Sequence, residues 1–165
     1  MRHFPTAVLT AALVVIAFAA TSVPAAASPA DEYRAAMKPF AHDLARWSGN
    51  VNAAAEAAVV KPELSCGTDL AELGRIGGWM ADDLKGTAQL APRPLASAHA
   101  DLTVAVERMG RAAASACGQP DEAARVIRGE VENFNTALTK IRNFTDGRFH
   151  RGRPGLTPDL PGSEG

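Results

Sequence analysis

Apolar residues recur at every third or fourth position along the chain from Tyr33 onward. This spacing places them on one face of an α-helix and is typical of helices that pack in bundles. Ser28 and Pro29 come just before the pattern, and these residue types are favoured at the N-cap and at the first position of a helix. The pattern therefore predicts a helix that begins at Pro29, with Pro39 causing a kink or short break over residues 35–39. Its inward residues would be Tyr33, Met37, Phe40, Leu44, Trp47, Val51, Ala54 and Ala58.

Three further segments have the same helical spacing, and residues that favour helix ends separate them. The second helix is predicted to begin at Thr68, the third at Pro94 and the fourth at Pro120. Cys117-Gly118 and Asp146-Gly147 are expected to end the last two. Because no segment alternates as a half-buried strand does, the pattern predicts an all-α fold. The inward residues of the three helices would be Leu70, Leu73, Gly77, Met80 and Leu84, then Leu95, His99, Leu102, Val106, Met109 and Ala113, and finally Ile127, Val131, Phe134, Leu138 and Ile141.

A glycine occupies one of the inward positions of the second helix. In a helix interior, Gly77 costs about 1 kcal/mol relative to alanine, so its place on the inner stripe needs a reason. We expect a close approach of a neighbouring backbone or a bulky side chain beside it. Trp47 and Trp79 are the two side chains that could fill this space.

Short connections make consecutive helices antiparallel, so residues 28–147 are predicted to form an up-down-up-down four-helix bundle. In this topology the start of the second helix lies at the same end as the end of the third helix. The only two cysteines, Cys66 and Cys117, are found at these two places. The topology and the cysteine count together predict one disulfide between them.

The N-terminal residues 1–27 have the features of a secretory signal peptide. A basic start at Arg2 precedes an apolar run, and Ala25-Ala26-Ala27 is typical of a cleavage site. Cleavage would leave 16 basic and 18 acidic residues, a formal charge of −2 that provides no general attraction to nucleic acid. We therefore expect a secreted or periplasmic protein without a transmembrane anchor, either a monomer or a weak oligomer.

The predicted topology brings a small set of polar and sulfur-containing side chains to the end of the bundle opposite the disulfide. Tyr33 and Met37 would face His99 there, beside Arg142 and Phe144. One interpretation is a haem or metal site with His99 and Met37 or Tyr33 as ligands. The other, which the residue types favour, is a core histidine hydrogen-bonded to Tyr33 or to a loop carbonyl beside a methionine that fills space.

The stretch Leu138-Thr139-Lys140-Ile141-Arg142-Asn143 before His150 resembles the final helix of the cytochrome b562 family. That resemblance implies a haem-binding bundle with a methionine on the first helix and a histidine near the end of the fourth. The sequence departs from it at Asp146-Gly147, which should end the helix before His150. Covalent haem attachment is not expected, because the chain has no C-x-x-C-H motif.

Residues 148–165 are rich in glycine and proline, and we expect them to form a disordered tail. Basic and aromatic residues are concentrated around its start, where they could bind an acidic envelope polymer, lipid headgroups or the acidic face of a protein. The chain has no recognisable catalytic motif, so we expect a non-catalytic binding or cell-envelope interaction module rather than a small secreted helical enzyme. The candidate partner-binding residues are Arg142, Phe144, Arg148, Phe149, His150, Arg151 and Arg153.

Overall fold

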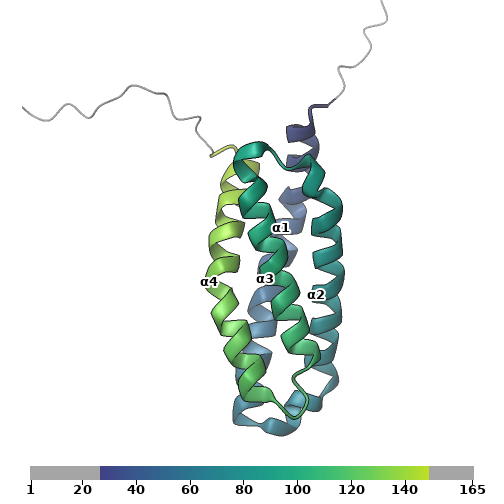
Figure 1. The fold of residues 1–165 in the computed structure, drawn as a ribbon, viewed down its shortest axis with the longest axis vertical. Helices are drawn as coiled ribbons and strands as arrows, with labels where there is room; N and C mark the ends of the chain where they lie inside the picture. The colour runs from purple at the N-terminus through teal and green to yellow at the C-terminus, as the bar shows by residue number, and fades with distance from the viewer. Residues whose placement is uncertain (1–26, 149–165) are drawn as a thin grey trace, which may run out of the picture.

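The computed structural model describes residues 27–148, and within this range the chain forms four long α-helices and no strand. The helices are α1 (Pro29–Val60), α2 (Thr68–Thr87), α3 (Ala96–Ala114) and α4 (Pro120–Thr145). They run alternately up and down, as Figure 1 shows, so the predicted all-α four-helix bundle is confirmed. Nearly all of the predicted signal peptide (residues 1–26) and residues 149–165 of the predicted tail lie outside the described residues.

The four helices are arranged in a ring in which each one contacts the next along the chain, and α4 closes the ring against α1. Short 3-10 turns, Pro62–Cys66, Ala88–Leu90 and Arg93–Leu95, form the first two connections. The start of α1 and the end of α4 lie at the same end of the bundle (Figure 1). The interface between α1 and α2 is the smallest of the four.

Residues that favour helix ends account for the start of α1 and the end of α4. The Ser28 hydroxyl oxygen accepts a hydrogen bond from the backbone N–H of Asp31 at 3.2 Å, so the predicted start of α1 is confirmed. The predicted ends of α3 are shifted inward, because the 3-10 turn through Pro94 precedes the helix and Ala114 ends it before Cys117. Gly147, with φ of 72°, follows the end of α4.

Helix α1 continues through Pro39 without interruption, so the predicted break over residues 35–39 does not occur. Proline removes one backbone donor, which leaves the carbonyl of Ala35 without its usual helical partner. Both residues are exposed to solvent. Water can therefore satisfy this carbonyl, and the helix does not have to end.

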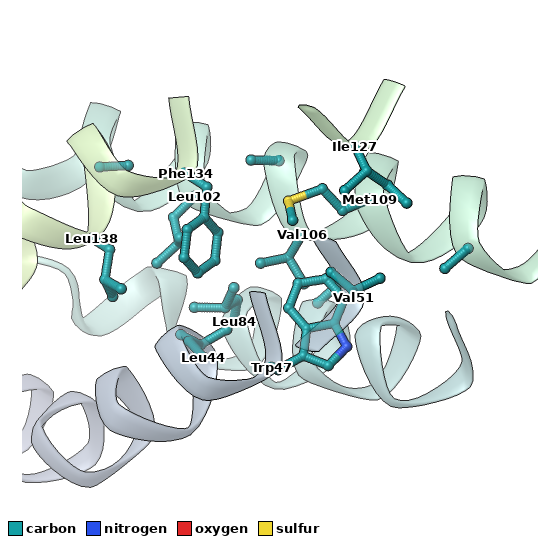
Figure 2. Close-up of a cluster of buried hydrophobic side chains, with 14 of the residues drawn as sticks. Leu44, Trp47, Val51, Leu84, Leu102, Val106, Met109, Ile127, Phe134 and Leu138 are labelled. Atoms are coloured by element: carbon teal, nitrogen blue, oxygen red, sulfur yellow. The ribbon is translucent and has the colours of Figure 1, made fainter. Parts of the chain in front are cut away.

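The core lies along the bundle axis and contains apolar side chains from all four helices. In its middle, the centre of the Phe134 ring of α4 lies 6.5 Å from the centre of the Trp47 ring of α1. Fully burying one large apolar side chain contributes about 1.5–3 kcal/mol relative to leaving it exposed. Figure 2 shows the buried side chains around these two rings: Leu44, Val51, Leu84, Leu102, Val106, Met109, Ile127 and Leu138.

Several predicted core positions are only partly buried: Phe40, Ala54, Leu73, Met80 and Val131. In four of these cases the following residue takes the core position, and it is small: Ala41, Ala55, Gly74 and Ala81. For Phe40, Leu73 and Met80, the prediction was wrong because a strict spacing of three and four residues placed the larger of two adjacent residues in the seam, meaning the line of contact between two helices. Where helices approach closely, the small residue occupies the seam and the large one lies beside it.

The seam between α2 and α3 is formed by glycines, as the inward glycine of α2 predicted. A Cβ atom on Gly77 would lie 2.5 Å from Cζ2 of Trp47 and 3.0 Å from Cα of Gly110. A Cβ atom on Gly74 would lie 2.6 Å from the backbone nitrogen of Ala114. Both reasons expected for a glycine at an inward position therefore apply, since the backbones approach closely and the indole of Trp47 fills the remaining space.

The predicted disulfide joins Cys66, in the first connection, to Cys117, in the loop between α3 and α4. The hydroxyl of Ser65 supports this region, because it donates to the carbonyl of Pro62 at 2.7 Å and accepts from the N–H of Gly118 at 3.4 Å. Closing a loop of this length stabilises the fold by about 4 kcal/mol through the unfolded state. The disulfide lies at the end of the bundle opposite the start of α1 and the end of α4 (Figure 1).

Candidate functional site

A buried polar network connects three helices at the end of the bundle opposite the disulfide. The hydroxyl of Tyr33 on α1 lies 3.0 Å from Nδ1 of His99 on α3. Nε2 of the same imidazole lies 2.7 Å from the carbonyl oxygen of Leu84 on α2. Tyr33 is fully buried and His99 is 2% exposed. The sequence prediction that brought these residues to one end of the bundle is confirmed.

The partners of His99 determine where the protons lie in this network. The Leu84 carbonyl can only accept a hydrogen bond, so Nε2 of the imidazole carries a proton and donates it to this carbonyl. In the tautomer with this single ring proton, Nδ1 accepts and the hydroxyl of Tyr33 donates to it. Burial raises the pKa of Tyr33 to about 12, because ionisation would place a charge away from water.

This geometry favours the interpretation of His99 as a core histidine. Both ring nitrogens are engaged, so a haem or metal ligand role would require the loss of one hydrogen bond. Met37 is fully buried near the same end of α1. Within residues 27–148, no group of three or more His, Cys, Asp or Glu side chains is placed to hold a metal ion. Helix α4 ends at Thr145, before His150, which lies outside the described residues.

A second site lies between α1 and α4, in a cavity of about 470 Å³ that we call the basic pocket. Its basic side chains are Lys38 and His42 from α1, together with Arg142 from α4 and Arg148 beyond its end. Arg142 extends toward α1, where one of its terminal nitrogens lies 3.4 Å from the carbonyl oxygen of Ala41. The remaining lining residues are Thr139, Asn143, Thr145 and Asp146.

The basic pocket brings together three cations that form no ion pair within the described residues. Eight other lysine and arginine side chains form ion pairs with carboxylates in the described part of the chain: Arg34, Arg46, Arg75, Lys85, Arg108, Arg111, Arg125 and Arg128. Within residues 27–148, Lys38, Arg142 and Arg148 form none, although Asp146 lines the same cavity. Their positive charge is therefore available to a ligand.

The structure separates the predicted partner-binding residues into three groups. Arg142 and Arg148 line the basic pocket. Phe144 instead packs inward, with its ring centre 6.1 Å from that of Tyr33, and the Arg34 guanidinium lies over its ring at 4.8 Å. The others, Phe149, His150, Arg151 and Arg153, lie outside the described residues.

Sequence reasoning missed Lys38 and His42, the two basic residues that α1 contributes to the pocket. Both are exposed and lie four residues apart, so they share one face of the helix. Their spacing was visible in the sequence. Their relation to Arg142 was not, because it depends on which face of α1 packs against α4.

Comparisons with known proteins do not assign the chain to a family. No protein-family model matches it, and no curated protein or solved structure is significantly similar to it. Among the described helices, none has the length and apolar content needed to cross a membrane. The functional proposal therefore depends on the site geometry.

Proposed function

We propose that the protein is an exported, non-catalytic binding module that attaches to an anionic polymer of the cell envelope through the basic pocket. The observation that carries this proposal is the convergence of Lys38, Arg142 and Arg148, without ion pairs among the described residues, in one cavity. Most other cations of the bundle are neutralised by neighbouring carboxylates. A local positive site on a protein with slight negative net charge attracts anions only at that place.

The chemistry of the pocket favours a polymer over a lipid surface. Every side chain that lines it is charged or polar, and none is apolar. A membrane-bound surface commonly places apolar side chains beside its basic ones, because these bury area at the acyl boundary. The sequence continues from Arg148 with two further arginines, Arg151 and Arg153, which supply charge for consecutive anionic groups of a polymer.

The test measures binding of the mature chain, residues 28–165, to polyphosphate and to polygalacturonate over a range of salt concentrations. The variant Lys38→Gln/Arg142→Gln removes two charges from the pocket, and both side chains are exposed. We expect about a tenfold loss of affinity. The slope of log K against log salt concentration should also be smaller in magnitude by about 2, because each contacting cation releases about one counterion. Circular dichroism confirms that the variant remains helical.

The matched control is Lys61→Gln/Arg93→Gln, which removes the same charge from exposed positions outside the pocket. Neither residue forms an ion pair in the described part of the chain. An equal loss of affinity in this control would contradict the proposal, because it would show that the polymer responds to the total charge of the protein and not to the basic pocket. Binding to phosphatidylglycerol vesicles but to neither polymer would also contradict it and would indicate a lipid ligand.

A further inference from the structure

A second surface lies on the other side of α1, in a groove between α1 and α2 that we call the aromatic groove. It has a volume of about 330 Å³ and shares no residue with the basic pocket. Both tryptophans of the chain line it. Its apolar and aromatic lining comprises Phe40, Trp47, Leu73, Ile76, Trp79 and Met80.

The floor of the groove is fixed by Trp47. Its indole N–H donates to the carbonyl oxygen of Leu73 at 2.8 Å, which ties α1 to α2, and its ring lies against Gly77. Trp47 is only 3% exposed. Three large side chains on the two helices, Phe40, Leu73 and Met80, remain partly buried beside it. The groove is therefore a preformed feature of the α1–α2 interface, the smallest of the four interfaces that form the ring.

The wall on the α2 side presents an aromatic ring to solvent. Trp79 is 57% exposed, although tryptophan side chains are highly buried on average in folded proteins. The guanidinium of Arg75 lies 3.7 Å from the centre of its ring, and Nε of that guanidinium donates to the carboxylate of Glu72 at 2.7 Å. This stacked cation holds the indole in position.

Acidic side chains give the groove its charge. Asp43 on α1 and Asp83 on α2 line it from opposite sides, and Arg46 is the only basic residue among the lining residues. Arg46 is paired with Asp43 at 3.0 Å, whereas the carboxylate of Asp83 forms no ion pair within the described residues. The ionisable groups of the groove therefore sum to a formal charge of −1.

We propose that the aromatic groove binds a hydrophobic organic cation, meaning a small molecule with an apolar body and an ammonium group. Aromatic rings attract such cations through the negative potential of their faces, and a nearby carboxylate adds to the attraction. The apolar floor accepts the body of the ligand, and the volume lies at the lower end of the range for small-molecule sites.

The test uses benzyltriethylammonium as the probe and the intrinsic fluorescence of the mature chain as the signal. Since both tryptophans line the groove, a bound ligand changes the emission directly. We expect a saturable change with a dissociation constant of about 1 mM, the affinity that a ligand of this size reaches at ordinary efficiency. Neutral N,N-diethylbenzamide and anionic benzenesulfonate should bind more weakly.

Two neighbouring aspartates provide a matched pair of variants. Asp83→Asn removes the unpaired carboxylate of the groove and should weaken binding of the cation about fivefold, the upper value for an exposed ion pair. Asp82→Asn removes a charge from the adjacent residue, which does not line the groove, and should leave binding unchanged. Trp79→Leu, at an exposed position, should also weaken binding of the cation. The fluorescence of Trp47 remains as the binding signal in this variant.

Three outcomes would overturn the proposal. The first is no saturable change with the cation, and the second is equal binding of the neutral and cationic probes. The third is a fluorescence emission that changes with protein concentration in the absence of ligand, together with a dimer in analytical ultracentrifugation. This result would mean that a second copy of the chain occupies the groove. None of these outcomes bears on polymer binding at the basic pocket, because the two sites share no residue.

Discussion

The packing of α2 against α3 can be tested by two alanine substitutions one turn apart in α2. A Cβ atom on Gly74 would lie 2.6 Å from the nitrogen of Ala114 and 2.8 Å from the carbonyl oxygen of Gly110. Both are backbone atoms, so they cannot rotate away, and the two helices would have to separate. A Cβ atom on Gly78 would meet nothing within 4 Å.

Gly78→Ala should stabilise the fold, whereas Gly74→Ala should leave its stability unchanged or lower it. Each one gains about 1 kcal/mol from the higher helix propensity of alanine. Gly74→Ala must also pay an overpacking cost of about 1–3 kcal/mol. Because the propensity gain is common to both, the difference between the variants isolates the packing cost. We therefore expect Gly78→Ala to be stabilised and Gly74→Ala to be about 1–3 kcal/mol less stable than Gly78→Ala.

Urea unfolding followed by circular dichroism at 222 nm measures both variants against the parent chain. The midpoint should shift while the slope stays constant, because the unfolded surface is unchanged. In thermal unfolding, each kcal/mol should move the midpoint by about 4 °C for a domain of this size. Equal stabilisation of Gly74→Ala and Gly78→Ala would refute the close approach of α2 and α3.

Two further predictions concern the disulfide and the buried tyrosine. Reduction, or the double substitution Cys66→Ser/Cys117→Ser, should lower stability by up to about 4 kcal/mol without changing the helical content of the folded state; an unchanged melting temperature would contradict this. Burial raises the pKa of Tyr33 from 10.0 to about 12, so its contribution is complete below pH 10 and is lost as pH rises through 12. Unfolding free energies should therefore fall by up to about 3 kcal/mol more in the parent than in Tyr33→Phe between these pH values, and parallel pH profiles would contradict the assignment.

The helices and the disulfide could be predicted from sequence because their signals are local. Ser28 caps α1, Gly147 follows the end of α4, and the places of Cys66 and Cys117 follow from antiparallel connections. The residues that form the contact line between two helices could not be predicted exactly. Apolar spacing does not show whether a large residue or the small residue next to it lies in that line. Phe40, Leu73 and Met80 were assigned to the core for this reason.

The same errors indicate where the surface is unusual. Of the five misassigned residues, Phe40, Leu73 and Met80 line the aromatic groove. A large apolar residue directly before a small one that packs between the helices is therefore the signal that could have located the groove. The basic pocket had a weaker signal. Lys38 and Arg142 are distant in sequence, and only the packing of α1 against α4 brings their charges together.

The hydrogen bonds of His99 also determine how the helices align along the bundle axis. A slide of α3 by one turn would displace the imidazole by about 5.4 Å relative to Tyr33 and Leu84. Such a slide would also break the close contacts of Gly74 and Gly77 on α2 with Gly110 on α3. Each buried polar group left without a partner would cost about 1–3 kcal/mol. The imidazole thereby aligns three helices at one end of the bundle, and the glycine contacts fix the same register farther along α2 and α3.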